Sequence, residues 1–335
     1  MSPLRLLERL LHLLPVLLGI SVIVFSMMAM TPGDPVQIML GDSLSDPAQV
    51  AALRHDMGLD LPVLARFVRF LGNAVTGDFG LSYFHRRPVL NVIADRLPAT
   101  VELTLAASII GIGAGIPLGA FSAVRPNSWF DRAATLGATL GISVPGFWFG
   151  ILLILAAGVE VHLLPISGRL SSDFQIPAVT GFMLLDTLIA GRLDAFADAL
   201  RHLLLPAFTL ALPMVAVLTR VTRSSMQDAL AQDFVLFAEA KGLRRTRVIG
   251  RHALKNALIP AVTVAALEIG SLLGGNMIVE TVFGWPGLGR LTVDAIFSRD
   301  FPLVQAAVLL YAVTYVMLNF LADIAYTMLN PRVRL

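Results

Sequence analysis

Long runs of apolar residues are the dominant pattern along this chain. A helix needs about 18 or more apolar residues to cross a bilayer, and six runs reach that length. They are Leu11–Met30, Ala99–Ala123, Ala133–Ala157, His202–Thr219, Asn256–Val279 and Pro302–Ala322. Only Glu102 and Glu268 place a charge inside a run, and Glu102 lies so near an outer end that we expect it to be solvated. The pattern predicts an all-α membrane protein with six transmembrane helices.

Two shorter patterns lie between the runs. Gly181–Gly191 is apolar but interrupted by Asp186, so we expect a short loop helix at the membrane interface. Between Leu61 and Leu71, apolar residues recur at helical spacing with two arginines among them. That spacing fits an amphipathic helix on the membrane surface, and equally a helix packed on other loops.

The first run is predicted to be a retained helix and to begin on the cytoplasmic side. It is longer than the apolar core of a secretory signal and has no usual cleavage pattern after it. Six spans place both termini on one side, and that side holds 14 of the 25 Lys and Arg residues. The positive-inside rule makes that side cytoplasmic. The segments Thr31–Pro98 and Gly158–Arg201 are then outside.

Composition removes several other classes of protein. The chain is 56% hydrophobic and 14% charged, which excludes an ordinary soluble domain and a disordered chain. Its net charge of +2 is too small to indicate a nucleic-acid partner. It contains no cysteine, phosphate-binding G-x-x-x-x-G-K-[ST] loop, H-E-x-x-H motif or G-x-S-x-G elbow. We therefore expect no enzyme activity, metal or cofactor, and we expect membrane lipid as a partner.

Glycines recur four residues apart within the runs. Gly111, Gly115 and Gly119 form the longest such series, with shorter ones at Gly137/Gly141 and Gly270/Gly274. Such spacing allows close helix packing in lipid, although glycine is common in membrane helices generally.

The loop before the fifth run has the most distinctive sequence. Phe234–Lys241 reads as a short helix that Gly242 is well placed to end. A second helix then leads into the run, with Arg244, Arg247, Arg251 and Lys255 on one arc of an ideal α-helix. The cationic arc could contact lipid headgroups, or the loop could dock another protein.

This loop resembles the EAA loop of ABC importer permeases, closest to the dipeptide/oligopeptide/nickel permease family. The resemblance rests on Glu239–Leu243 followed by His252–Pro260. Stretches along most of the chain agree with it: Thr31–Pro35, Gly77–Ser82, Arg96–Glu102, Leu164–Gly168, Val179–Phe182, Leu200–Pro206, Leu273–Asn276, Val279–Gly289 and Asn330–Arg332. Glu268 departs from the family pattern, so no role for it can be carried over.

The resemblance implies a type I importer permease with the MetI-like fold in a bacterial inner membrane. It implies a second, homologous permease subunit, two cytoplasmic ATP-binding subunits that hydrolyse the ATP, and a periplasmic or lipid-anchored substrate-binding protein. Peptides are the expected cargo, with glutathione, nickel and other small ligands left open. The residues expected to couple to the ATPases are Phe234, Phe237, Ala238, Glu239, Ala240, Lys241, Gly242 and Leu243.

The same resemblance divides the chain into three parts. Residues 1–97 form the first helix and an outer segment, residues 98–328 form the transmembrane core with the coupling loop at 233–256, and residues 329–335 form a cytoplasmic tail. Candidate groups for the translocation path are Glu268, Asn276 and Asn319, because polar groups inside a membrane should face protein or water. An ion-gradient transporter using Glu268 is the alternative function.

Overall fold

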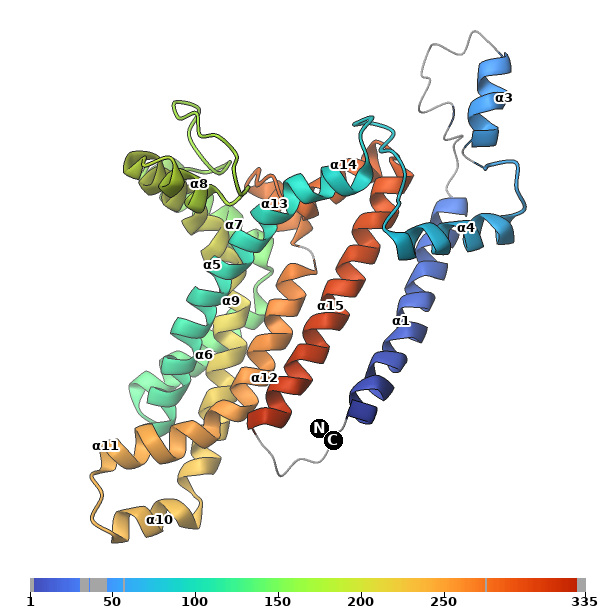
Figure 1. Cartoon of the computed structure of the whole chain (residues 1–335). Coiled ribbons are helices and arrows are strands. Elements are labelled where there is room, and N and C mark those ends of the chain that lie inside the picture. Colours follow the sequence, from blue (N-terminus) through green and yellow to red (C-terminus); the bar gives the residue numbers. More distant parts are fainter. Residues whose placement is uncertain (1–2, 31–35, 37–46, 57, 275, 330–335) are drawn as a thin grey trace.

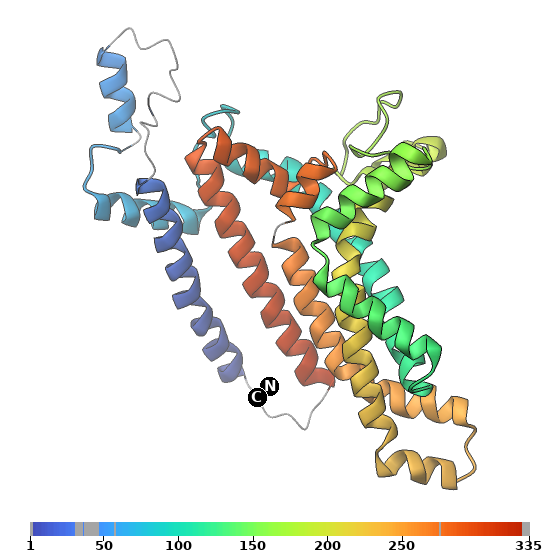
Figure 2. The ribbon, with the colours of Figure 1, turned by 180° about the vertical axis from the view of Figure 1, so that it is seen from behind.

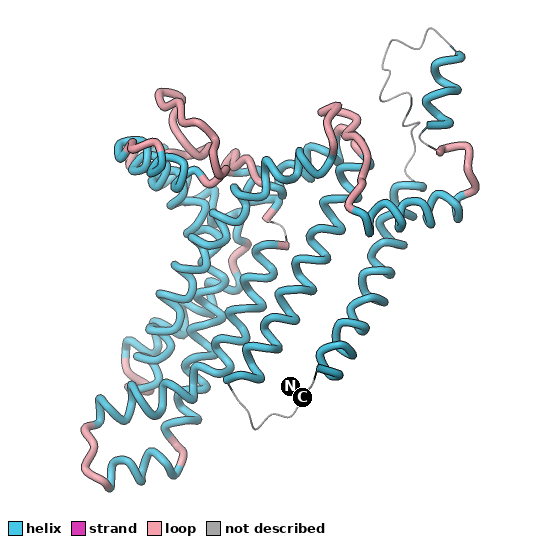
Figure 3. The backbone as a smooth tube through the Cα atoms, viewed as in Figure 1, coloured by secondary structure: helices cyan, strands magenta, loops and turns pink. Residues whose placement is uncertain are grey.

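The computed structural model describes residues 3–30, 36, 47–56, 58–274 and 276–329. Within these residues the chain is helical and contains no strand, only an isolated β-bridge between Leu81 and Pro88 (Figure 3). The elements are α1 (Pro3–Met30), α3 (Pro47–Asp56), α4 (Val63–Thr76), α5 (Val89–Val124), α6 (Trp129–Ser143), α7 (Gly146–Leu153), η2 (Ile154–Glu160), α8 (Met183–Ile189), α9 (Leu193–Leu230), α10 (Asp233–Ala240), α11 (Arg245–Arg247), η3 (Val248–Ala253), α12 (Leu254–Leu273), α13 (Met277–Val282), α14 (Leu288–Phe297) and α15 (Phe301–Leu329). The predicted all-α class is confirmed for the described residues.

Four helical stretches are long and apolar enough to cross a membrane. They are α5, α9, the continuous stretch Arg245–Leu273 and the Phe301–Leu321 part of α15, which contain most of the second, fourth, fifth and sixth apolar runs. A fifth candidate is the bent pair formed by α6 with α7 and η2. In α1, Leu14–Met30 forms a shorter apolar helix. The chain is thus a membrane protein with four to five candidate spans among the described residues, and the count of six stays a prediction.

The third apolar run is bent sharply. Its two helical parts, Trp129–Ser143 and Gly146–Glu160, meet at 105° (green segment in Figure 2). The break falls at Val144 and Pro145, where Val144 is extended (φ −82°, ψ 125°). Proline disfavours a helical conformation in the residue before it and has no N–H to continue the helix. The third predicted span, Ala133–Ala157, is therefore not a straight helix.

The fifth run also ends earlier than its composition suggests. Helix α12 stops at Leu273, and Asn276 is already the N-cap of the short helix α13. Helix α13 thus lies outside the straight span, together with α14, at the end of the molecule opposite to α10 (Figure 1).

The centre of the molecule is the pair α5 and α9, which pack at very close range. A Cβ added at Gly111, Gly115 or Gly119 would lie within 3.0 Å of atoms of α9, including the backbone carbonyl of Thr219. Buried side chains of both helices continue the contact, among them Leu103, Ala107, Met214 and Leu218. This glycine series therefore serves helix packing.

The two ends of the bundle carry different elements. Helices α10 and α11 project from one end, where α1 begins and α15 finishes (Figure 1). Helices α3, α4, α8, α13 and α14 gather at the opposite end. The segments that the sequence places inside and outside are thus separated in space.

Candidate coupling site and outer polar network

Helix α10 begins and ends where the sequence indicates. It follows Gln232, whose backbone is extended, and carries Asp233 in its first turn. At its end the N–H of Gly242 donates to the carbonyl of Glu239 (2.9 Å) and that of Leu243 to Ala238 (3.3 Å). Gly242 has φ +78°, a left-handed conformation that glycine adopts without a Cβ penalty. The predicted short helix and its glycine stop are confirmed.

One face of α10 is buried and the other is open. Val235 and Ala238 pack with Val248 of η3, and Leu243 covers the edge of this cluster. On the open face the side chains of Leu236 and Phe237 are 62% and 63% exposed. The other coupling residues of the prediction are also exposed: Phe234, Glu239, Ala240, Lys241 and Gly242. Exposed apolar side chains of this kind mark a surface that contacts protein or membrane.

The α10 hairpin is anchored to three long helices. Met226 and Ala229 of α9 form a buried cluster with Ala123 of α5 and with Ala253 and Ala257, which lie where η3 runs into α12. Helix α10 packs on η3 through Val248, and η3 is in turn packed against α5 and α9 at this cluster.

The cationic residues that follow α10 do not form the predicted arc of one ideal α-helix. Residues 248–253 adopt a π-helical turn, which changes the angle between successive side chains. Arg244, Arg247, Arg251 and Lys255 are all exposed.

A buried ion pair that sequence reasoning missed lies at the same end. Asp131, in the first turn of α6, is 3% exposed and accepts from Arg223 of α9 at two atoms, Nε (2.5 Å) and Nη2 (2.9 Å). The N–H of Asn127 also donates to it (2.9 Å), while its own N–H donates to Ser128 (3.2 Å). The spacing of Ser128 and Asp131 is a helix-capping signal, but nothing in the sequence indicates Arg223 as the partner. The pair fixes the start of α6 to the part of α9 that leads into α10.

The three candidates for the translocation path are not joined to one another. Glu268 is half-buried in α12 and makes no hydrogen bond or ion pair with any described residue. Asn276 donates to the carbonyl of Leu272 (2.7 Å), and Oδ1 of Asn319 is buried without a partner in the described part of the chain. No hydrogen bond links any two of them, so their role stays a prediction.

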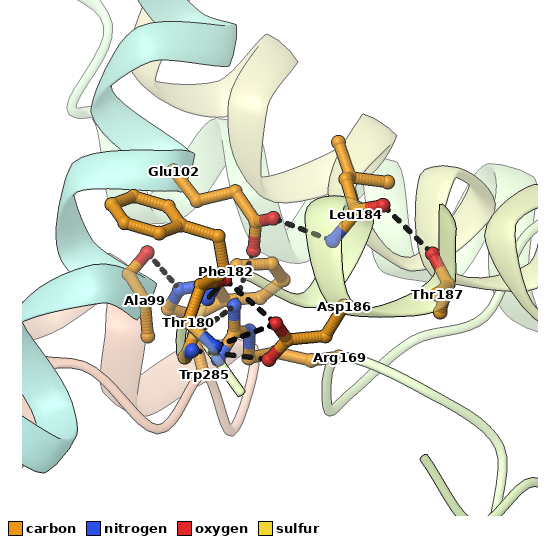
Figure 4. A network of polar contacts seen from close by, with 10 residues as sticks. Ala99, Glu102, Arg169, Thr180, Phe182, Leu184, Asp186, Thr187 and Trp285 are labelled. Carbon is orange, nitrogen blue, oxygen red and sulfur yellow. Dashed lines mark hydrogen bonds and ion pairs between the residues drawn. The ribbon is translucent and has the colours of Figure 1, made fainter. Parts of the chain in front are cut away.

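Glu102, expected to be solvated, is instead buried at the centre of a polar network (Figure 4). Its side chain is 7% exposed and forms an ion pair with Arg169, from the loop before α8. The N–H of Leu184, at the start of α8, donates to Oε1 of Glu102 (2.8 Å). A buried carboxylate requires such charge and hydrogen-bond partners. The network therefore fixes the outer loop to α5.

Arg169 and Asp186 extend this network. The guanidinium of Arg169 lies 5.5 Å from the centre of the Trp285 ring, and the indole N–H of Trp285 donates to the carbonyl of Ala99 (2.8 Å). Asp186 accepts from the N–H and hydroxyl of Thr180 (2.8 and 2.7 Å). Burial alone would raise the pKa of Asp186, but these hydrogen bonds outweigh it, so the pKa lies below its usual value.

A second buried carboxylate, Glu280 of α13, ties α5 to α14. It is fully buried and accepts from the hydroxyl of Thr100 (2.8 Å) and the backbone N–H of Arg290 (3.0 Å). A Cβ at Gly287 would lie 2.4 Å from its carboxylate, so only glycine leaves room for it. Glu280 thus satisfies a free N–H in the first turn of α14. The one feature of the sequence that could have indicated this buried carboxylate is the glycine-rich stretch that follows Glu280.

Comparison with known proteins identifies the class that this fold and these sites define. Residues 115–335 match the family described as binding-protein-dependent transport system inner membrane component, and residues 4–104 match the N-terminal part described for such membrane components. The chain therefore belongs to the binding-protein-dependent transport system inner membrane component family.

Curated relatives match along almost the whole chain. It is 43% identical to the dipeptide transport system permease protein DppB of Escherichia coli K12, over 98% of each chain. It is 41% identical to the di/tripeptide permease DppB of Pseudomonas aeruginosa UCBPP-PA14, over 96% of each. It is 39% identical to the glutathione permease GsiC of Escherichia coli K12, over 98% of this chain and 97% of the relative.

A solved structure supports the fold. A chain of the inward-facing MetNI methionine ABC transporter superposes with a TM-score of 0.51 at 15% identity, covering 72% of this chain and 97% of that one. The protein is thus an ABC importer permease with the MetI-like fold, and ATP hydrolysis resides in partner subunits. Family membership implies a partner permease, an ATPase and a substrate-binding protein, and it does not favour the ion-gradient alternative.

Proposed function

We propose that this permease carries di- and oligopeptides or a related small peptide into the cytoplasm by alternating access. The proposal is supported by the functions of its relatives, which are dipeptide, di/tripeptide and glutathione transport. The relatives match this chain over nearly their full length, which supports a transport function of the same kind.

We propose an assembly in which the chain pairs with a second, homologous permease and contacts two cytoplasmic ATPases. A periplasmic or lipid-anchored binding protein delivers the substrate to the outer end. In this arrangement α1 and the bent α6–α7–η2 pair complete six spans. The first turn of α1 and the last of α15 lie at the end that carries α10, which supports two cytoplasmic termini in a bacterial inner membrane (Figure 1).

The domain division belongs to the same proposal. Residues 1–97 form the N-terminal helix and outer segment, residues 98–328 form the transport core with the coupling loop at 233–256, and residues 329–335 form a cytoplasmic tail. The path through the core is proposed to pass Glu268, Asn276 and Asn319.

The open face of α10 is the observation that carries the mechanism. Leu236 and Phe237 are exposed, while Val235 and Ala238 brace the helix from behind. We propose that this face, with Phe234 and the residues from Glu239 to Leu243, docks into an ATPase. Closure of the ATPases would then move α10, and the buried cluster at its base would pass the motion to α5, α9 and α12.

A valine at Gly242 tests this coupling. A Cβ there meets nothing within 4 Å, so the change introduces backbone strain without a clash. A left-handed conformation is unfavourable by roughly 1–2 kcal/mol for a residue with a side chain, so the end of α10 should shift. We expect Gly242→Val to reduce uptake several-fold in proteoliposomes while the ATPases continue to hydrolyse ATP.

The matched control is Gly191→Val, at the opposite end of the molecule. Gly191 also has a positive φ (+69°) and open space around a Cβ, so it receives the same strain. Uptake per ATP hydrolysed should stay near the native ratio in this control. If Gly242→Val keeps the native ratio of uptake to ATP hydrolysis, then the end of α10 is not needed for coupling.

A further inference from the structure

Helix α4 is strongly amphipathic. At about 100° per residue, its apolar side chains fall on one arc of roughly 160°. They are Val63, Leu64, Phe67, Val68, Phe70, Leu71, Ala74 and Val75. The opposite arc carries Arg66, Arg69 and Asn73. None of the residues of α4 is buried, although the apolar arc is large.

One edge of the apolar arc packs on α1. The ring of Phe25 lies 5.3 Å from that of Phe67 and 5.8 Å from that of Phe70, between centroids. Helix α4 runs across α1 near the outer end of α1 (Figure 1). The other edge of the arc is left open, with Leu64 74%, Val68 61% and Val75 88% exposed.

The position of Arg69 shows how α4 is oriented about its own axis. A Cβ on Gly58 would lie 2.8 Å from Nη1 of Arg69, so this guanidinium lies against the segment that descends from α3. The hydrogen bond from His55 lowers the pKa of Asp60, and the charge of Arg69 adds to the effect. Because α3 and this segment lie on the outer side of α4, the polar arc faces outward (Figure 1). The open apolar edge is then turned away from α3, toward the depth of the bundle at which α1 has exposed apolar residues.

Helix α1 also exposes apolar side chains, in the turns that precede Phe25. Leu18, Val22 and Ile23 are 49%, 43% and 58% exposed and form an apolar helix surface of the kind that contacts lipid. The open edge of α4 is aliphatic and carries no charge, whereas protein-docking patches are enriched in aromatic and arginine anchors. An apolar face next to a span, with cationic residues on the opposite arc, matches a helix lying in the membrane interface.

We propose that α4 lies in the outer interface of the lipid bilayer, with Leu64, Val68 and Val75 among the acyl chains. Arg66 and Arg69 then sit at the level of the headgroups and the outer loops, and α4 fixes the height of α1 in the membrane. The inference rests on the proposed function in one respect, namely that α1 spans the bilayer.

This chain contains no cysteine, so an introduced cysteine is its only labelling site, and the assembly with the native chain gives the background from the partner subunits. We would label Leu64→Cys, Val68→Cys and Val75→Cys with a nitroxide, using the assembled transporter in vesicles of phosphatidylethanolamine and phosphatidylglycerol. Collision with oxygen, which enters lipid, is compared with collision with a water-soluble nickel chelate. Asn73→Cys, exposed on the opposite arc, is the matched control, and Ile23→Cys reports on α1 separately.

We expect the ratio of oxygen to nickel collisions to be several-fold higher at positions 64, 68 and 75 than at position 73. Equal ratios on the two arcs would overturn the proposal, because both arcs would then be in water. Protection of positions 64, 68 and 75 from both reagents would also overturn it, because a protein partner would then cover them. A water-exposed Ile23 label would instead reject α1 as a span, which is a failure of the proposed function.

Discussion

Buried acidic side chains in this protein act as links between elements that are distant in sequence. Glu102 joins α5 to the loop before α8, Asp131 joins α6 to α9, and Glu280 joins α5 to α14. Each carboxylate receives at least two hydrogen bonds, which compensates for the loss of water. In a bundle held together mainly by non-directional apolar contacts, such links determine which elements stay in register.

The linking role of a buried carboxylate can be tested at Glu280 with glutamine, which replaces one carboxylate oxygen by an NH2 group and keeps the shape of the side chain. Both oxygens of Glu280 accept hydrogen bonds, from Thr100 and from the N–H of Arg290. In Glu280→Gln the amide NH2 replaces one of the two acceptors. If it faces Thr100, it can donate to Oγ1 but the hydroxyl hydrogen loses Glu280 as its acceptor, and if it faces Arg290, the backbone N–H loses its acceptor, so either way one buried donor loses its partner. A buried donor without a partner is unfavourable by about 1–3 kcal/mol. We expect a lower thermal unfolding temperature for the purified complex and a mobile N-terminal turn of α14 in hydrogen exchange.

The neighbouring Asp294→Asn serves as the control for this change. Asp294 is also a carboxylate near Arg290, at 3.9 Å, but its side chain is 66% exposed. Exposed ion pairs contribute about 0–1 kcal/mol, so the unfolding temperature should barely change. Equal effects of the two substitutions would show that Glu280 does not position α14.

At the scale of whole helices, the close packing of α5 on α9 depends on glycine at particular positions. A Cβ at Gly119 would lie 2.5 Å from the carbonyl oxygen of Thr219, a backbone atom that cannot move aside. Gly113, on the same helix, is exposed and has nothing within 4 Å of a Cβ. The spacing of the glycines predicted close packing, but only the structure shows which glycines α9 contacts.

Alanine at these two glycines should therefore change the stability of the fold differently. Gly119→Ala forces α5 and α9 apart and should destabilise the fold by about 1–3 kcal/mol, in the range measured for overpacking. Gly113→Ala should leave stability unchanged or raise it by up to about 1 kcal/mol, because alanine is the better helix former. Thermal unfolding of the purified complex distinguishes them. Destabilisation of similar size by both variants would contradict the close contact at Gly119.

The helices that could be predicted from the sequence are those governed by local rules. Helix α10 was predicted because Gly242 supplies the left-handed stop, and α5, α9 and α15 because apolar length alone requires them. The 105° turn at Pro145 was not predicted, since proline permits a break without fixing its angle. The π-turn before α12 has no local signal at all. The prediction that Glu102 is solvated was wrong because its ion-pair partner, Arg169, lies 67 residues away in the sequence and no local rule indicates it.

At the scale of the whole molecule, an open apolar surface and a set of loops held by buried carboxylates lie at opposite ends of the helix bundle. Helix α10, with its open apolar face, lies at one end, and α8 and α14, which Glu102 and Glu280 link to α5, lie at the other (Figure 1). Helices α5 and α9 run between these ends and are packed at close range. This close packing supports the proposal that a movement of α10 would displace α5 and α9 together.

This arrangement gives a prediction about sidedness that labelling of intact cells can test. Val179, in the loop before α8, and Thr246, in α11, are both exposed, and these elements lie at opposite ends of the bundle (Figure 1). This chain has no native cysteine, so Val179→Cys should react with a membrane-impermeant maleimide from the periplasm. Thr246→Cys lies outside the face proposed to dock an ATPase, and it should react only after the inner membrane is permeabilised, because the positive-inside rule predicts that the end with the cationic loops is cytoplasmic. Labelling of Thr246→Cys in intact cells would invert the predicted topology and separate α10 from any cytoplasmic ATPase.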